Sequence, residues 1–443
     1  MIFKIIVKMN KNIFGYLLIS LFLLVFANSC QKEELVPYKL LREDIKIEEP
    51  IGGFFAIINE QLNIKVKSAS DDGISYIWFL DEDEISRDKN LNYTFDRAGE
   101  FKLSLHASQL NLKYIYDYDI TVGFEKIPSP SEGSSAYITK ILDFMPAIGQ
   151  FTNKLPVYSE GDTQESMNQK VLAAIGNNKR GMISLGGFGG YVVVGFDHTI
   201  LNVIGKRDFR VIANAFYSAA NPDSNAPEGG SCEPGVIMVA YDANKNGVPD
   251  DNEWYEIAGS AHEDPAKELW YQEAVDAGND VNIYYDYEIT YHRPLAEPDS
   301  QDQWATYIRW EDNKGNSGYK VKNGFHKQSY YPLWATGDKL TFKGTRLPQN
   351  GVDESGAGSY YVLYKFRYGY ADNETNSKDE SAIDISWAVN KKRQKVNLPG
   401  VDFIKIYSGV NQENGWLGEC STEITGIEDL HVLGVSIETR SEQ

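Results

Sequence analysis

Apolar and polar residues alternate in short runs along most of this chain. Between residues 45 and 122, turn-forming residues separate these runs. A period of two places the apolar side chains on one face of a β-strand. The runs are Phe54–Ile58, Leu62–Val66, Ser75–Phe79, Asn92–Phe95, Phe101–Leu105 and Tyr116–Val122. Strands at this spacing predict a β-sandwich of about one hundred residues or fewer.

Most apolar runs beyond residue 137 are also typical of strands. They are Met182–Leu185, Tyr191–Val194, Phe209–Ile212, Val236–Ala240, Val281–Tyr285, Tyr287–Tyr291, Tyr360–Phe366, Ile383–Ala388 and Phe403–Ile406. Many strands between Gly- and Asn-rich loops favour a closed double sheet. One or two helices are expected, at Ile138–Phe144 and at Thr163–Ile175, where Met167, Val171 and Ala174 form an apolar stripe. The predicted fold class is therefore mainly β, with an immunoglobulin-like β-sandwich followed by a larger, jelly-roll-like β domain with one or two short helices.

Changes in composition divide the chain into five parts. Pro, Ser and Gly concentrate between Glu125 and Ala136, as in a short semi-rigid linker. The expected parts are a signal peptide (1–30), a tether (31–44), the β-sandwich (45–123), the linker (124–136) and the larger β domain (137–440).

The N-terminus has the order of an export signal. Lysines precede an apolar run, Ile13–Phe26, and small residues then lead to Cys30. The run is short for a membrane span. Ala27–Cys30 resembles a bacterial lipobox, which implies lipidation of Cys30, and Gln31–Glu34 resembles the signal that sends Bacteroidota lipoproteins to the outer face of the outer membrane. We therefore expect a lipid-anchored protein on the cell exterior that contacts the membrane only through its anchor.

Charge narrows the class of partner. The 443 residues carry a net charge of −20. A chain this acidic is repelled by nucleic acid and by anionic membrane surfaces, so a nucleic-acid partner is not expected. Divalent cations or neutral ligands fit the charge better.

One loop, at residues 242–253, has the spacing of a twelve-residue calcium site. Oxygen-bearing groups recur at alternate positions, and Gly247 stands where the loop turns sharply. The expected ligands are Asp242, Asn244, Asn246, the Val248 carbonyl, Asp250 and Glu253. The flanking residues are β-like, which predicts a strand, loop, strand unit stapled by structural calcium. The alternative is a hairpin turn that binds no metal, because Asp, Asn and Gly dominate turns in general.

Two cysteines remain in the expected mature protein beside Cys30. In an oxidising compartment, Cys232 and Cys420 either form a disulfide or stay as two buried thiols, and sequence alone does not choose.

Sequence motifs in both domains resemble a known family. In the first domain, Tyr76–Trp78, Tyr93–Phe95, Ala98-Gly99 and Phe101–Leu105 look like a PKD domain, in which Trp78 is the core tryptophan. The motifs of the second domain are Gly186–Tyr191, Asp208–Arg210, Asn214–Phe216, Glu233–Gly235, the calcium loop with Trp254–Glu256, Phe325–Lys327, Tyr330–Trp334, Gly369–Asn373, Gly415–Glu419 and Ser421–Glu423. Together they resemble Bacteroidota cell-surface lipoproteins that carry a PKD-like domain ahead of a β domain. The resemblance implies ligand capture or surface interaction, often beside an outer-membrane uptake system.

Motifs for common catalytic chemistry are absent from the sequence. The six histidines show no zinc spacing, and there is no Gly-x-Ser-x-Gly elbow. Gly186–Gly190 lacks the Lys and Ser/Thr of a P-loop, so we expect a tight β-turn there. The carboxylates available for hydrolysis are Glu233, Glu253, Asp312, Asp372, Glu419 and Glu423, but their spacing in the fold cannot be read from the sequence. Trp334 and Trp416 are candidates for stacking on a ligand, whereas Trp387 is expected in the core.

The expected function is non-catalytic binding of a glycan, or of a cofactor such as a corrinoid that is handed to a TonB-dependent transporter. The alternatives are a carbohydrate hydrolase that uses paired carboxylates and a structural adhesin. A hydrolase predicts converging carboxylates with raised pKa in the deepest cleft. A binding protein predicts an aromatic cleft with few titratable groups.

Overall fold

The chain folds into two compact units in the computed structural model. The structure describes residues 38–48, 54–58, 60–96, 99–123, 130–218 and 226–439. The first unit comprises the described residues up to 94 together with residues 100–121, and residues from 122 onward belong to the second unit. The expected signal peptide and Cys30 lie outside the described residues. None of the helices in the described ranges is long and apolar enough to span a membrane.

The first unit is an immunoglobulin-like β-sandwich, as predicted. Its largest sheet has the order β2 (Phe54–Ile57), β9 (Leu112–Gly123), β8 (Gly99–Gln109), β5 (Ser75–Leu80) and β6 (Asp83–Ser86). Two smaller pairs are β3 (Gln61–Ile64) with β7 (Leu91–Thr94) and β1 (Ile45–Ile47) with β4 (Val66–Ser68). Trp78 has no exposed surface, and its indole N–H donates to the Asp88 carbonyl at 3.1 Å. Trp78 is therefore a core residue of the sandwich.

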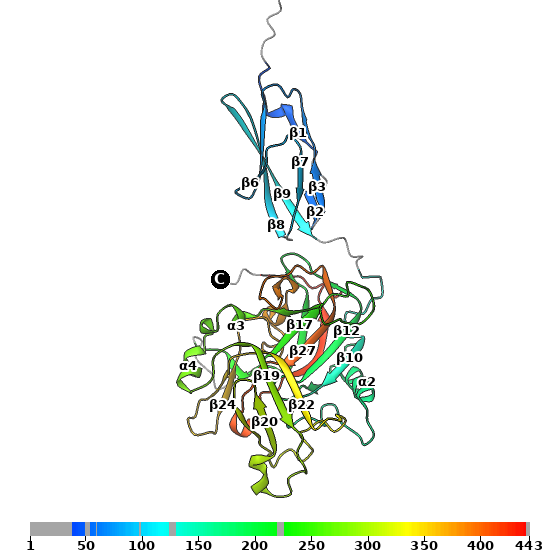
Figure 1. Ribbon diagram of the computed structural model, residues 1–443, viewed down its shortest axis with the longest axis vertical. Coiled ribbons are helices and arrows are strands. Elements are labelled where there is room, and N and C mark those ends of the chain that lie inside the picture. The colour runs from blue at the N-terminus through cyan, green and yellow to red at the C-terminus, as the bar shows by residue number, and fades with distance from the viewer. Residues whose placement is uncertain are drawn as a thin grey trace, which may run out of the picture. The chain divides into compact units, whose positions relative to one another are not determined.

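The second unit is built on a six-stranded antiparallel sheet (Figure 1). Its strand order is β10 (Lys140–Met145), β12 (Tyr191–Leu201), β27 (Gly400–Ser408), β17 (Gly235–Ala240), β18 (Trp254–Ile257) and β26 (Ala388–Val389). The middle strands are apolar at nearly every position, so both faces of this sheet are buried. Ile404 and Ile406 pack into one core, whereas Tyr407 and Val236 pack into the other.

Further sheets contribute to these two cores. The first core is shared with the sheet of β11 (Ile183–Ser184), β28 (Glu423–Asp429), β14 (Phe209–Ala213) and β25 (Ala382–Ile383). The second core is shared with β21 (Ser317–Lys320), β20 (Ile308–Asp312), β19 (Tyr284–His292) and β22 (Lys339–Arg346), and with β15 (Phe216–Tyr217), β16 (Gly229–Ser231), β24 (Tyr361–Tyr364) and β23 (Gly351–Asp353). The unit is mainly β, as predicted, but its described strands form no closed barrel. Apolar residues on both faces of the central strands allow packing on both sides of this sheet.

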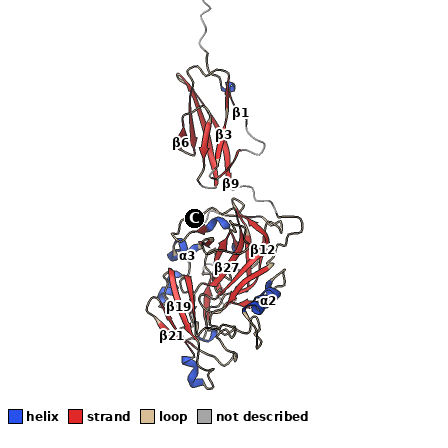
Figure 2. Cartoon of the chain, turned by 45° about the vertical axis from the view of Figure 1, so that its right-hand side comes forward, coloured by secondary structure: helices blue, strands red, loops and turns tan. Residues whose placement is uncertain are grey.

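Helices are short and few beside the strands (Figure 2). The helix expected at Thr163–Ile175 is confirmed as α2 (Gln164–Ile175), where the Thr163 hydroxyl caps the helix by accepting from the Ser166 N–H. The helix expected at Ile138–Phe144 is wrong, because these residues lead into β10, which pairs with β12. The other short elements are α3 (Ser260–Glu263), α4 (Tyr271–Asp276), η1 (Arg42–Asp44), η2 (Pro265–Lys267), η3 (Gln301–Thr306), η4 (Asp379–Ser381), η5 (Ile385–Trp387), η6 (Gly415–Leu417), β13 (Lys206–Arg207) and β29 (Ile437–Glu438).

The glycine run between β11 and β12 forms the tight turn that the sequence predicts. Gly186 has φ of 66°, and a Cβ at this position would lie 2.4 Å from the Ala147 carbonyl oxygen. A side chain is therefore excluded by the neighbouring backbone.

Candidate functional site: a carboxylate floor beneath an aromatic rim

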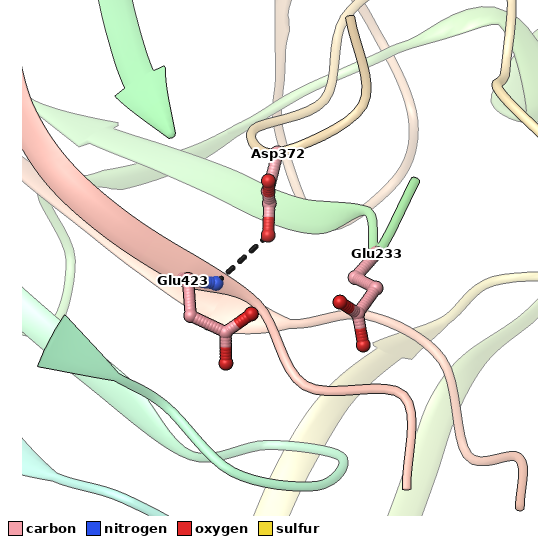
Figure 3. Close-up of side chains that lie close together, drawn as sticks. All are labelled: Glu233, Asp372 and Glu423. Atoms are coloured by element: carbon pink, nitrogen blue, oxygen red, sulfur yellow. Dashed lines mark hydrogen bonds between the residues drawn. The ribbon is translucent and has the colours of Figure 1, made fainter. Parts of the chain in front are cut away.

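Three acidic side chains from distant parts of the sequence meet in the second unit (Figure 3). Glu233 precedes β17, Asp372 lies in the loop after β24, and Glu423 begins β28. One carboxylate oxygen from each lies within 4.8 Å of those of the other two. We call Glu233, Asp372 and Glu423 the carboxylate triad.

Backbone hydrogen bonds bring the three segments of the triad together. The Glu233 N–H donates to the Asp372 carbonyl at 2.8 Å, and Gly235 bridges to Ala371. The Glu423 N–H donates to Oδ2 of Asp372 at 2.8 Å (Figure 3). Asp372 has φ of 51°, a conformation that Asp and Asn adopt more readily than most residues. The loop therefore holds its carboxylate between the two glutamates.

Neutral groups supply the remaining hydrogen bonds of the triad. Glu233 accepts from the Ser421 N–H at 2.9 Å and from the Ser231 hydroxyl at 3.1 Å. The Ser421 hydroxyl donates to Glu423 at 2.8 Å. No ion pair joins any of the three carboxylates to a Lys, Arg or His in the described ranges. Their negative charge is therefore not offset by a neighbouring side chain.

Burial and mutual repulsion change the acidity of the triad. Asp372 and Glu423 are 3% and 5% exposed. Burial raises the pKa of Glu233 to about 7. Burial together with the neighbouring carboxylates raises the pKa of both Asp372 and Glu423 well above the usual range. Near neutral pH, the triad therefore retains protons or requires a cation.

Glu233 and Glu423 line a pocket of about 400 Å³. Its mouth carries two exposed aromatic side chains, Phe325 (83% exposed) and Trp416 (58% exposed). The rest of its lining comprises Gln150, Phe151, Asn214, Ser231, His326, Leu363, Asn414, Leu417, Glu419 and Ser421. The pocket thus combines an aromatic rim with a polar, acidic floor.

Glu419 adds a fourth acidic group to this pocket. It accepts from the Gln150 N–H at 2.7 Å. Burial, together with repulsion from Glu413, raises the pKa of Glu419 to about 8, while Lys320 acts in the opposite direction. A carboxyl group that is protonated at neutral pH can donate as well as accept hydrogen bonds.

The two candidate tryptophans have different environments. Trp416 lies at the pocket mouth, where its indole N–H donates to the Ser359 carbonyl at 3.3 Å. Trp334 is only 8% exposed and stacks on Phe144 with ring centroids 6.0 Å apart. Its indole N–H donates to Gln164 at 3.1 Å. The expectation that Trp334 stacks on a ligand is therefore wrong, because its ring is enclosed in the core beside α2.

The predicted calcium loop joins β17 to β18, which pair as antiparallel neighbours. Gly247 has φ of 82° at the sharp turn. Asp242 accepts from the Asn246 N–H at 3.0 Å and from the Gly247 N–H at 2.8 Å. Asn244 and Asn246 both donate to Asp250, at 2.6 and 3.0 Å. The polar side chains of the loop thus hydrogen-bond to one another and to the loop backbone.

Glu253 closes the same loop. It is 7% exposed and accepts from the Ala243 and Asp250 N–H groups at 3.1 and 3.0 Å. Val248 is half exposed on the loop. Calcium binding by this loop, with the predicted ligand set, stays a prediction.

Cys232 and Cys420 are free and buried. Of the two possibilities left open by the sequence, the structure has the pair of buried thiols. Burial, with nearby carboxylates, raises the pKa of both thiols well above their usual value. Both thiols are therefore protonated and poorly nucleophilic at neutral pH.

A second pocket, of about 480 Å³, lies beside α3 and β26. His262 lines it, with one ring nitrogen 2.6 Å from Glu256 and the other 2.8 Å from the Tyr370 hydroxyl. Burial lowers the pKa of His262 below its ordinary value, so its ring is neutral near pH 7. Trp387 also lines this pocket and is only partly buried at the end of η5. Trp387 packs against the first core, as expected, but it ends a 3₁₀ turn and does not lie on a strand.

The sequence identifies all three triad residues as candidate carboxylates, but it does not predict that they lie close together. Glu233, Asp372 and Glu423 all belong to the candidate carboxylates, and each lies in one of the motifs that carry the family resemblance. The available signal was that short acidic motifs containing Gly or Ser recur in separate loops. Asn414 carries no sequence signal for this pocket, and Phe325 belongs to the motif Phe325–Lys327 but is not among the residues predicted to bind a ligand.

Comparisons with known proteins identify the first unit. Residues 44–109 match the PKD-like domain family, which makes the N-terminal unit a PKD-like immunoglobulin domain. No curated protein matches the chain.

Several solved structures match the chain at low similarity. One is a quinonprotein alcohol dehydrogenase-like protein from Bacteroides thetaiotaomicron, with 16% identity over 35% of this chain and 33% of that chain, and a TM-score of 0.15. This chain thus spans about a third of that protein. Another is a SusE-like protein, with 9% identity over 87% of this chain and 97% of that chain, and a TM-score of 0.23. A third is the Bacteroides ovatus mixed-linkage glucan utilization locus SGBP-B, in complex with a mixed-linkage heptasaccharide, with 11% identity over 84% and 98% of the two chains and a TM-score of 0.16. Similarities of this size assign no ligand to this chain.

Proposed function

We propose that the chain is a surface protein that binds a glycan in the pocket between Trp416 and the carboxylate triad, without cleaving it. One observation carries this proposal, namely that exposed aromatic rings stand at the mouth of a pocket whose floor is rich in carboxylates and amides. Sugar rings have apolar C–H faces that stack on aromatic side chains. Their hydroxyl groups hydrogen-bond to carboxylate and amide oxygens at fixed positions. The pocket supplies both kinds of contact.

The arrangement of the triad favours binding over hydrolysis. A glycosidase places its two carboxyl groups on either side of the scissile bond, about 5–9.5 Å apart, with the sugar between them. In the triad, oxygens from all three groups lie within 4.8 Å of one another. Asp372 and Glu423 are nearly fully buried, which leaves no space for a sugar ring between them.

The direct test is a binding screen of the full chain, with calcium present, against a glycan array and a panel of corrinoids and haems. A glycan hit should weaken by about tenfold or more in Trp416→Ala, because a stacked aromatic ring is a typical binding hot spot. The matched control is Phe55→Ala, which removes a 52% exposed aromatic side chain from the PKD-like unit. Equal binding by both variants would contradict the assignment of this pocket, and a corrinoid hit alone would replace the ligand class.

A carbohydrate hydrolase is the second candidate, and the pKa of Glu419 favours it. A pocket carboxyl group with a pKa of about 8 is protonated at neutral pH and suits a general acid. Prolonged incubation of bound glycans with wild type and with Glu419→Gln distinguishes the two functions. Products formed by wild type and lost in Glu419→Gln would support hydrolysis, whereas intact glycans support binding alone.

The proposed cellular setting is the outer face of the outer membrane, where Cys30 carries the lipid anchor and a TonB-dependent transporter receives the ligand. Support comes from the Cys30 sequence motif and from the resemblance to surface lipoproteins. Mass spectrometry of the mature N-terminus tests the anchor, and protease treatment of intact cells tests exposure. A mature chain without lipid on Cys30 would contradict the anchor.

A further inference from the structure

The spacing of the carboxylate triad matches the coordination sphere of one hard cation. Oxygen ligands lie about 2.3–2.6 Å from Ca²⁺, so two oxygens on opposite sides of the ion are about 4.6–5.2 Å apart. One oxygen from each of Glu233, Asp372 and Glu423 lies within 4.8 Å of the others. A single ion can therefore contact all three carboxylates.

The charge of the triad calls for such an ion. Three carboxylates that face one another repel strongly when they ionise in a poorly hydrated site. Their hydrogen-bond donors are serine hydroxyls, backbone N–H groups and the Asn214 amide, which carry no net charge. A divalent cation would replace the missing positive charge.

Asn414 provides a second, independent sign of a polar ligand in this pocket. It is 1% exposed, and it lines the pocket together with Glu233 and Glu423. Neither the oxygen nor the nitrogen of its side-chain amide has a hydrogen-bond partner among the described residues. A buried amide without partners is costly, because its polar groups lose their hydrogen bonds to water. The pocket is thus incomplete without a polar occupant.

The donor atoms define the class of metal. All three ligands are carboxylate oxygens, which suit Ca²⁺, Mg²⁺ and Mn²⁺ rather than soft metals. The thiols of Cys232 and Cys420 are buried and do not belong to the cluster of converging ligand atoms. Ca²⁺ tolerates irregular coordination and long contacts, whereas Mg²⁺ demands a near-ideal octahedron at about 2.1 Å.

We propose that Glu233, Asp372 and Glu423 bind a Ca²⁺ ion at the floor of the pocket, separate from the predicted loop site at residues 242–253. The ion would face the pocket between Glu233 and Glu423. Hydroxyl or carboxylate groups of a bound glycan would complete its coordination, a step that rests on the proposed function. Binding of the cation itself does not rest on it.

Calorimetric titration of the full chain with CaCl₂, after removal of metal and without sugar, tests this site. The double variant Asp242→Asn with Asp250→Asn removes loop ligands, so that only the triad is measured. This loop variant should bind one Ca²⁺ per chain, and adding Glu423→Gln should reduce the affinity by at least about tenfold. The matched control is Glu374→Gln, which alters a buried carboxylate that pairs with Lys365 outside the triad, and it should leave the affinity unchanged.

Proton release provides a second measurement that does not depend on whether Glu423→Gln folds. Ca²⁺ binding to the loop variant near pH 7 should release protons into weak buffer, because the protonated triad must ionise to bind the metal. Absence of calcium binding in the loop variant, or equal binding after Glu423→Gln, would overturn the proposed site. A failed glycan screen with normal calcium titration would overturn only the proposed function.

Discussion

The backbone N–H of Glu423 donates a 2.8 Å hydrogen bond to Oδ2 of Asp372, which ties the first residue of β28 to the loop after β24. The other oxygen of Asp372 accepts from the Asn214 N–H at 3.2 Å. One buried side chain therefore satisfies backbone groups from two different strand ends.

Removing this side chain should destabilise the second unit. Asp372→Ala leaves two backbone N–H groups unpaired, at about 1–3 kcal/mol each. It also places alanine at a φ of 51°, which costs about 1 kcal/mol more. We expect the free energy of unfolding, measured with urea, to fall by about 3–7 kcal/mol. Asp372→Asn retains one acceptor and tolerates this φ, so it should lose less, and equal losses would contradict the explanation.

The raised pKa values predict how stability changes with pH when metal is absent. A carboxyl group whose pKa is higher in the folded state holds its proton more tightly there, so stability falls as pH rises through the folded pKa. For Glu233, this fall spans its ordinary pKa of 4.5 to the folded value of about 7. Thermal unfolding in chelator between pH 5 and 8 should therefore show a decline that is shallower in Glu423→Gln, which mimics protonated Glu423 and removes its charge from the triad. An unchanged slope in this variant would remove the triad as the cause.

Chelation should lower the melting temperature of the second unit. A ligand that binds only the folded state adds about 2.7 kcal/mol at a hundred times its Kd. Asp242→Ala should reduce the stabilisation by calcium without abolishing it, because the triad remains. If neither chelator nor Asp242→Ala changes the melting temperature, the loop binds no structural calcium.

Substitution of Trp334 should reduce the stability of the second unit, whereas substitution of Trp416 should reduce ligand binding. Trp334→Ala empties a core position beside Phe144 and should cost about 3–5 kcal/mol in the free energy of unfolding. Trp416→Ala removes an exposed ring and should change stability by less than about 1 kcal/mol, but should weaken ligand binding. Urea unfolding and the glycan titration, run on both variants, separate the two roles.

The buried thiols should be unreactive in the folded protein. In a chain with Cys30→Ser, a thiol reagent should modify Cys232 and Cys420 only after unfolding in guanidinium chloride. A reducing agent should leave the melting temperature unchanged. A lower melting temperature under reducing conditions would instead indicate a disulfide.

Local patterns in the sequence predict most of the elements but few of the long-range contacts. Alternation finds the strands around Trp78, and spacing alone finds the loop from Asp242 to Glu253, because both depend on neighbours in the chain. The triad is different. Its members are separated by more than a hundred residues and by about fifty, and only the strand order of the second unit brings them together.

The errors have a common physical origin. Trp334 stands in an aromatic, proline-containing segment that is typical of loops, yet the packing of α2 against β10 encloses it. The apolar run before Phe144 fits either a helix or a strand, and pairing with β12 decides the outcome. In both cases a tertiary neighbour, which the local pattern does not contain, determines the environment of the side chain.

Strand β17 joins the two predicted cation sites. Glu233 lies two residues before its start at Gly235, and Asp242 lies two residues after its end at Ala240. Its edges are hydrogen-bonded to β27 and β18, and apolar cores cover both of its faces. A strand held in this way cannot slide or twist without breaking the sheet. The pocket floor and the predicted calcium loop therefore lie at opposite ends of one rigid strand segment that spans about 30 Å. A metal bound at either end resists the same cooperative opening of the central sheet.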